Sequence, residues 1–250
     1  MSGHSKWSTI KHKKARTDEK KGKEYTKLAK EIIIAARAGG GDPEANSKLK
    51  LAIQNAKAIN MPNENIARAI KRGTGEVESD AIEELVYEGY APGGVAVMLA
   101  IATDNRNRTA SDIRHLFAKN GGNLGETGCV SYLFERKGLL TINRDKLPMD
   151  VDEFMLQAIE AGADDVREDD DIIEVVTTPE NFMAVKENLE AAADPDGAEI
   201  VMLPGNTVEI KDEAVAAKIL KLIDVLEDHD DVQHVYANFS IPEEIMEKLL

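Results

Sequence analysis

Cysteine is almost absent from this chain of 250 residues, which contains Cys129 alone. A single cysteine excludes an internal disulfide and any zinc site that needs several cysteines. No stretch of 18 apolar residues occurs, which excludes a membrane-spanning helix. The first residues also lack the apolar core of a signal peptide, and acidic side chains come too early for a transit peptide. We therefore expect a cytoplasmic protein in a reducing setting, with no membrane contact.

Aromatic residues are also scarce, at 4% of the chain, and there is one tryptophan. Hydrophobic residues reach 42% overall, so cores can form, but they must be built mainly from aliphatic side chains and methionine. A length of 250 residues allows about one to three domains.

Charge is distributed very unevenly along the chain. The formal net charge is −15, yet residues 1–30 hold ten basic and three acidic residues, a net +7. Residues 1–72 carry +10, so the remaining residues carry −25. A basic head on an acidic body suits a polyanion bound at one end, and nucleic acid is the polyanion that we expect.

The basic head mixes lysines with side chains that can contact phosphates or bases. Lysines bind phosphate oxygens, hydroxyls can hydrogen bond to them, and an indole can stack on an unpaired base. From Lys20 onward, the alternative is that the lysines only form the solvated face of a helix. The candidate nucleic-acid-binding residues of the head are Lys6, Trp7, Lys11, His12, Lys13, Lys14, Arg16, Lys20, Lys21, Lys23 and Lys27.

Residues 1–16 lack helical periodicity, and we expect them to form an arm. Apolar residues then recur at helical spacing, as Leu28, Ile32 and Ala36 do in the first of three segments. The predicted helices cover residues 17–38, 46–59 and 63–72.

Beyond residue 80 the pattern becomes that of strands separated by turn residues. Ala91-Pro92-Gly93-Gly94 predicts a turn between two of the strands. The predicted elements are strands 85–90, 95–103 and 129–134 and a helix at 109–120.

Residues 139–204 form an acidic block, with four basic and 18 acidic residues and a net charge of −14, which we do not expect to touch nucleic acid. Its pattern matches the strand-helix-strand-strand-helix-strand order of a ferredoxin-like sandwich. The elements located in the block are strands 139–143, 172–177 and 199–203 and helices 151–161 and 180–193. A helix at 212–227 and a strand at 232–239 follow it.

The predicted sheet that precedes the acidic block has only one helix to cover it. The helix and strand that follow the block can complete that sheet, so we predict that the block is inserted into a discontinuous middle domain. The expected fold class is α+β, with an N-terminal three-helix domain followed by two ferredoxin-like α/β domains, the third inserted into the second. The predicted domains are residues 1–78, residues 79–138 plus 205–250, and residues 139–204.

One loop outside the head also carries cations next to a helix start. Thr103 to Thr109 joins a strand to a helix and contains Arg106 and Arg108 beside two asparagines. Helix N-termini and arginines both bind anions, which predicts contact with phosphate or RNA. The alternative is that both arginines only pair with the abundant surface acids.

No motif of the sequence predicts catalysis. The glycine cluster at 121–128 resembles a nucleotide-binding loop, but it follows a helix and precedes a strand, the reverse of what such loops need. Cys129 lies in an apolar segment without an activating partner, and the histidines lack metal-ligand spacing. We therefore expect no catalytic residue, no metal site and no cofactor.

Several stretches taken together resemble the YebC/PmpR proteins and their mitochondrial translational-activator relatives. The resemblance spans residues 1 to about 137, and the acidic half matches only in length and pattern. The matching stretches include Gly3-His4-Ser5-Lys6-Trp7, Ile10-Lys11-His12-Lys13, Ala35 to Pro43, Asn60-Met61-Pro62, Ile66 to Gly73, Tyr87 to Val95, Thr103 to Thr109 and Gly121 to Gly125.

The resemblance implies a cytoplasmic, non-enzymatic protein of three domains. Members of that family are described as probable transcriptional regulators that bind DNA. Others are described as ribosome-associated factors that help translation through difficult sequences such as proline runs. The partner expected for a monomeric chain is therefore DNA or ribosomal RNA, and the ribosome itself stays open as an alternative.

Overall fold

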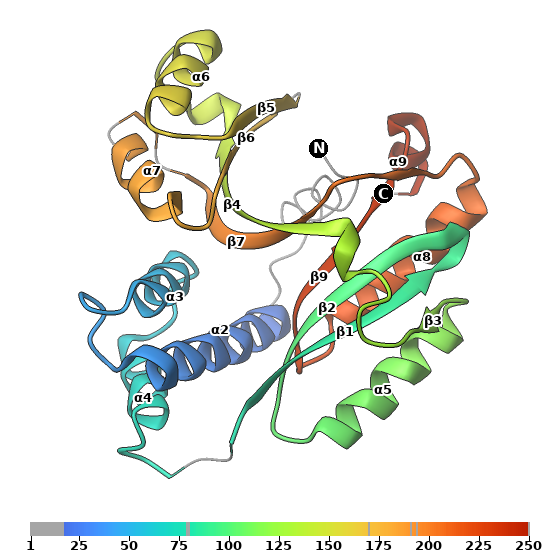
Figure 1. Cartoon of the computed structure of the whole chain (residues 1–250), viewed down its shortest axis with the longest axis horizontal. Helices are drawn as coiled ribbons and strands as arrows, with labels where there is room; N and C mark the ends of the chain where they lie inside the picture. Colours follow the sequence, from blue (N-terminus) through green and yellow to red (C-terminus); the bar gives the residue numbers. More distant parts are fainter. Residues whose placement is uncertain (1–17, 79–80, 170, 191, 194, 250) are drawn as a thin grey trace. The chain divides into compact units, whose positions relative to one another are not determined.

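The computed structural model describes residues 18–78, 81–169, 171–190, 192–193 and 195–249 (Figure 1). The chain divides into two compact units. Of the described residues, one unit holds those of Phe134–Leu203, and the other joins those of residues 18–133 to those of residues 204–249.

The N-terminal part of the larger unit is a group of three helices around a small aliphatic core. Buried Asn46 joins the first helix to the second: its amide nitrogen donates to Ala35 O at 2.8 Å, and its oxygen accepts from Leu49 N at 3.1 Å. A Cβ at Gly73 would lie 2.6 Å from Ala36 Cβ, so glycine permits the close approach of the third helix. The helices are α2 (Asp18–Gly39), α3 (Ser47–Ala58) and α4 (Asn63–Gly73). The buried core consists of Ile32, Ile33, Ala35, Ala36, Leu49, Ala52, Ala56, Met61, Ile66 and Ala69.

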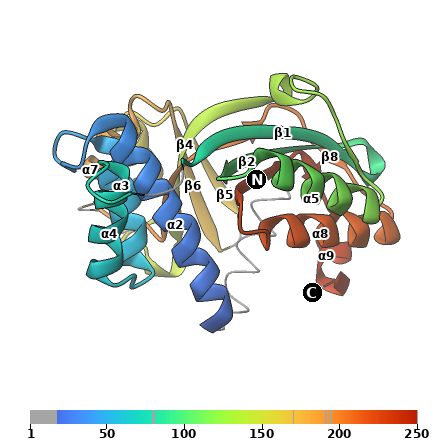
Figure 2. The same ribbon diagram turned by 90° about the horizontal axis from the view of Figure 1, so that it is seen from below.

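A four-stranded sheet of order β3-β1-β2-β9 forms the rest of the larger unit. Helices α5 and α8 cover the same face of this sheet (Figure 2). Alternate residues of the second strand, such as Val97 and Leu99, enter a core with Phe117 and Ile223. The elements are β1 (Glu83–Ala91), β2 (Val95–Thr103), α5 (Arg106–Lys119), β3 (Asn123–Leu124), α8 (Glu213–Glu227) and β9 (Val232–Ala237). Short elements β8 (Val208–Glu209), β10 (Phe239–Ser240) and α9 (Glu243–Leu249) complete the unit.

The sheet of the larger unit combines strands from both sides of Phe134–Leu203. Strand β9 pairs antiparallel with β2, with Leu99 opposite Val235, and α8 packs beside α5. Its chain order is strand-strand-helix-strand-helix-strand, so the middle sheet has the two layers of a ferredoxin-like domain without that fold's order of elements. The difference arises because β1 and β2 form a tight hairpin through Pro92–Gly94 instead of flanking a helix.

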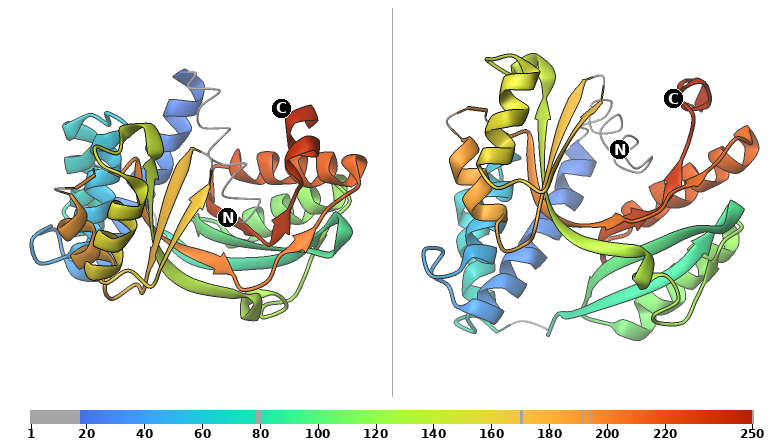
Figure 3. Two further views of the ribbon diagram at one scale, coloured as in Figure 1. Left: turned by 90° about the horizontal axis from the view of Figure 1, so that it is seen from above. Right: turned by 45° about the horizontal axis from the view of Figure 1, so that its top comes forward.

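The Phe134–Leu203 unit has the full ferredoxin-like order. Its sheet runs β5-β6-β4-β7, and α6 and α7 lie on one face of it (Figure 3). Phe154 and Phe182 from the two helices are fully buried with Leu140 and Ile173 from the strands. The elements are β4 (Phe134–Asn143), α6 (Val151–Glu160), β5 (Asp165–Asp169), β6 (Ile172–Thr177), α7 (Phe182–Leu189) and β7 (Gly197–Pro204). The α+β class, with three helices followed by antiparallel α/β parts, is thus confirmed.

Candidate nucleic-acid interface

Seven of the candidate binding residues lie outside the described part of the chain, so their role stays a prediction. The backbone of Lys20 is described in α2, whereas its side chain is not. The seven arm residues are Lys6, Trp7, Lys11, His12, Lys13, Lys14 and Arg16.

The lysines of α2 are described from Lys21 onward, and most of them contact the end of α8 or the segment that joins α8 to β9. Lys21 is exposed. Lys23 Nζ lies 2.8 Å from Asp228 Oδ2, and Lys27 Nζ donates to Glu227 O. Residues 23, 27 and 30 lie on one face of the helix because they are spaced by four and three positions. That face of α2 therefore meets an acidic segment of the same unit.

Lys30 is largely enclosed, with 17% of its side chain exposed. Its ammonium donates to Ala102 O at 3.0 Å, to Asp230 O at 2.9 Å and to Asp231 Oδ1 at 2.8 Å. An ammonium has three protons, so these acceptors satisfy all of them. We call this arrangement the Lys30 socket.

Asp231 forms the floor of the Lys30 socket and is itself buried, at 5% exposure. Its Oδ2 accepts from Thr109 Oγ1 at 2.7 Å, Arg108 Nη2 at 3.1 Å and Thr103 Oγ1 at 3.2 Å. Burial alone would raise the pKa of this carboxyl, but hydrogen bonds from Lys30, Thr109 and Arg108 outweigh burial and hold the pKa well below its ordinary value. Asp231 therefore stays charged at neutral pH.

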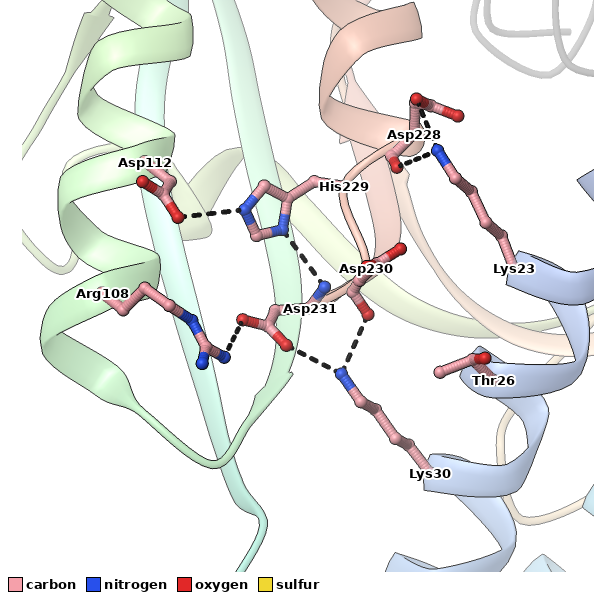
Figure 4. A pocket seen from close by; sticks show the side chains of 9 residues that line it. All are labelled: Lys23, Thr26, Lys30, Arg108, Asp112, Asp228, His229, Asp230 and Asp231. Atoms are coloured by element: carbon pink, nitrogen blue, oxygen red, sulfur yellow. Dashed lines mark hydrogen bonds and ion pairs between the residues drawn. The ribbon is translucent and has the colours of Figure 1, made fainter. Parts of the chain in front are cut away.

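A polar cavity of about 580 Å³ opens beside the Lys30 socket (Figure 4). His229 lies on its wall: Nδ1 accepts from Asp231 N at 3.1 Å, and Nε2 is 3.7 Å from Asp112 Oδ2. Three cations and four carboxylates line the cavity, so the charges largely offset each other. The lining residues are Lys23, Thr26, Lys30, Arg108, Asp112, Asp228, His229, Asp230 and Asp231.

The two arginines of the loop at residues 103–109 differ in their partners. Arg108 pairs with exposed Asp104 at 2.8 Å, as the alternative for this loop expects, and it also pairs with buried Asp231. Asn105 Oδ1 caps α5 by accepting from Arg108 N at 3.1 Å, so α5 begins at Arg106 and its first turn is already hydrogen bonded. Arg106 is exposed and makes no ion pair with any described residue. The guanidinium of Arg108 is thus engaged by carboxylates of the same chain, whereas that of Arg106 is available to an external anion.

Arg106→Ala and Arg108→Ala should therefore separate binding from stability. We expect Arg106→Ala to leave the melting temperature unchanged and to weaken nucleic-acid binding modestly, because its side chain forms no ion pair with any described residue. Arg108→Ala should lower the melting temperature, because it removes a donor to Asp231. Thermal unfolding of both single variants measures this, and equal melting temperatures would contradict it.

The helical part exposes more basic than acidic side chains. Between residues 21 and 73, seven basic side chains are exposed, against the acidic Asp42, Glu44 and Glu64. Arg68 pairs with Glu64, and Arg37 donates to Ile82 O. This part of the molecule is therefore the described surface best suited to phosphates. The exposed cations are Lys21, Arg37, Lys48, Lys57, Arg68, Lys71 and Arg72.

The glycine-rich segment after α5 is organised around Glu88 of β1. The buried carboxylate accepts from the backbone nitrogens of Gly128 at 2.7 Å, Val130 at 2.7 Å and Ser131 at 2.8 Å. Burial would raise the pKa of Glu88, but these hydrogen bonds outweigh it and lower the pKa. The strand predicted at 129–134 is therefore wrong, because Glu88 takes the amides that a strand would pair, and Ser131–Leu133 forms a 3₁₀ turn instead.

Cys129 lies in this turn region and not in a strand. Burial raises the pKa of its thiol, and the nearby Glu88 carboxylate raises it further. A raised pKa makes the thiol a poor nucleophile at neutral pH.

In the described ranges, no three His, Cys, Asp or Glu side chains are placed to hold a metal ion. The helices of the described ranges also include none long and apolar enough to cross a bilayer.

Glu88→Gln should destabilise the middle sheet measurably. The amide offers one acceptor oxygen and turns an NH₂ toward backbone donors, so buried N–H groups lose partners, at a cost of about 2–3 kcal/mol. Glu84→Gln is the matched control, because Glu84 is exposed on the same strand. Urea unfolding at neutral pH compares them, and an equal midpoint for the two variants would contradict the role given to Glu88.

Three residues that organise this region were missed from the sequence: Lys30 as a socket ligand, Asp231 and Glu88. Lys30 counted only as charge, and Asp231 ends an acidic run that is typical of a solvated turn. Glu88 occupies an alternating strand position, where a lone carboxylate between apolar neighbours could have indicated a buried anion.

Two protein-family models match the chain. The TACO1/YebC protein N-terminal domain matches residues 5–76, and the TACO1/YebC second and third domain matches residues 82–239.

Similar proteins span the whole chain. A "probable transcriptional regulatory protein" of Syntrophomonas wolfei is 68% identical over all of both chains. One of the same name from Halothermothrix orenii is 56% identical over all of this chain and 99% of its own. The crystal structure of a conserved hypothetical protein from Aquifex aeolicus is 53% identical, covers 95% of this chain and 97% of its own, and superposes with a TM-score of 0.87.

Proposed function

This chain belongs to the TACO1/YebC family, and we propose that it is a non-enzymatic, nucleic-acid-binding regulator of gene expression that acts by binding DNA. The observation that carries the proposal is the confinement of positive charge to one end, with +10 over residues 1–72 against −25 over the rest. The names of the relatives as probable transcriptional regulators support the choice of DNA.

In this proposal, the arm and the three-helix part (α2, α3 and α4) both contact the nucleic acid. The arm would supply phosphate contacts, with Trp7 available to stack on a base. The exposed cations of α2, α3 and α4 would extend the contact along the backbone of the nucleic acid. The acidic Phe134–Leu203 unit would be kept away from it by charge repulsion.

The alternative function is a ribosome-associated translation factor that binds RNA. A feature of the helical part favours it: α4 has only 11 residues, and its amide side chains for reading bases are exposed Asn63 and half-buried Asn65. Such a helix suits sequence-specific DNA reading poorly, whereas folded RNA offers clefts and unstacked bases to a basic arm.

The salt dependence of binding is the first test of either function. If about five phosphates are contacted, the logarithm of affinity should fall against the logarithm of salt concentration with a slope of about −4. Fluorescence anisotropy with a DNA duplex and with a structured RNA measures the slope. A slope near zero for both would remove the electrostatic basis of the proposal.

Sedimentation distinguishes the two functions. Cell lysate is run on a sucrose gradient at low salt, with and without ribonuclease. Co-sedimentation with ribosomes that disappears in an arm variant with Glu in place of its lysines would favour the translation factor. Absence from ribosomes, together with a sequence-specific DNA footprint at physiological salt, would favour the DNA-binding regulator.

A further inference from the structure

The contact between the helical part and the middle sheet is polar. The buried apolar residues form separate clusters, one around Ile32, Leu49 and Ile66 and the other around Leu99 and Ile223. The hydrogen bonds and ion pairs of α2 described above join the two parts. Polar contacts of this kind are typical of surfaces that separate reversibly.

The acceptors on the middle side resemble what a nucleic acid would offer. Asp228 and Asp231 present carboxylates, and Glu227 and Asp230 present carbonyl oxygens, to the three lysines of one α2 face. Phosphate oxygens bind lysine ammonium groups in the same way. The segment Glu227–Asp231 thus occupies side chains that a polyanion would use.

We propose that the acidic segment Glu227–Asp231 competes with nucleic-acid phosphates for Lys23, Lys27 and Lys30, and that binding of nucleic acid releases α2 from this segment. The inference rests on the proposed nucleic-acid binding and adds a regulatory contact to it. The α2 face that meets the segment is then a second phosphate-binding surface, covered while the chain is free.

Release of α2 does not leave the buried carboxylate of Asp231 without hydrogen bonds. When Lys30 leaves, Asp231 keeps Arg108, Thr103 and Thr109 as donors, so its carboxylate remains hydrogen bonded. The outer pair is partly exposed, with 34% of the Lys23 side chain and 61% of the Asp228 side chain accessible, so salt and phosphates can reach it.

Zero-length carbodiimide crosslinking reports the contact directly. The reagent joins a lysine amine to a carboxylate as an amide only when the two are in contact, which suits the Lys23–Asp228 pair. The Lys137–Asp164 pair, 3.2 Å apart within the Phe134–Leu203 unit, gives an internal reference. The full chain is crosslinked with and without a single-stranded RNA or a DNA duplex, and both crosslinks are quantified by mass spectrometry.

At saturating oligonucleotide, the Lys23–Asp228 crosslink should fall at least about threefold relative to the reference crosslink. If anisotropy shows binding but the Lys23–Asp228 crosslink is unchanged, the proposed competition is wrong, and the proposed function is unaffected. Absence of binding to either oligonucleotide at low salt would overturn both.

Asp228→Asn tests the competition by a second route. The variant removes the carboxylate charge that Lys23 contacts and keeps all three lysines for phosphate, so the contact between α2 and the segment should weaken. Asp230→Asn is the control, because it removes the same charge from the same segment, whereas Asp230 accepts from Lys30 through its backbone oxygen. We expect Asp228→Asn to bind oligonucleotide about twofold more tightly than Asp230→Asn. Weaker or equal binding by Asp228→Asn would overturn the proposal.

Discussion

Reversing four cations of the arm should abolish most of the affinity of this chain for nucleic acid. The change turns the net charge of residues 1–30 from +7 to −1, so phosphate attraction becomes repulsion. We expect the dissociation constant to rise by about a hundredfold or more at low salt, as measured by anisotropy. The variant carries Lys11→Glu, Lys13→Glu, Lys14→Glu and Arg16→Glu.

A matched control distinguishes the effect of the arm from the effect of total net charge. Four exposed lysines of the larger unit, far from the arm in sequence, can be changed to glutamate to give the same total charge. This control should bind only slightly more weakly than the unaltered chain. Equal losses in both variants would mean that overall charge and not the arm governs binding. The control carries Lys119→Glu, Lys211→Glu, Lys218→Glu and Lys221→Glu.

Local pattern predicted the regular elements well. Strand β2 was predicted at its observed bounds, Val95–Thr103, because an apolar run follows a Pro-Gly-Gly turn that allows little else. The three helices of the head were predicted within about one residue because apolar spacing, Asn46 and the glycines fix their ends.

Elements that depend on partners far away in the sequence could not be predicted from it. Strand β5 was not located, because Asp165–Asp169 has four charged residues and one valine, and only pairing with β6 makes it a strand. The turn at Ser131–Leu133 depends on a carboxylate about 40 positions earlier. Neither partner can be read from a local window.

The candidate site was predicted as charge and not as geometry. The lysines of α2 were counted toward the basic head, but the acceptors of Lys30 lie up to 201 positions away in sequence. Composition assigns a sign to a segment, whereas the fold decides whether its cations meet phosphate or the carboxylates of the same chain.

Asp231→Asn should give the largest loss of stability of any single substitution proposed for this chain. The amide leaves Lys30 and Arg108 without their buried counterion and turns an NH₂ group toward donors. Breaking a buried ion pair from one side costs about 3–5 kcal/mol. Asp230→Asn is the control, because Asp230 is exposed and contributes its backbone oxygen to the socket. Urea unfolding should shift the midpoint for Asp231→Asn alone.

The pH dependence of stability tests whether the charge of Asp231 causes the loss of stability in Asp231→Asn. Because its pKa in the folded chain lies below the ordinary value of 3.8, this carboxylate contributes stability that is complete above that pH. The contribution is lost as pH falls further, through the folded pKa. The stability difference between the unaltered chain and Asp231→Asn should therefore be constant near neutrality and shrink from about pH 4 downward. A difference that does not change with pH would mean that shape, and not charge, makes Asp231 necessary.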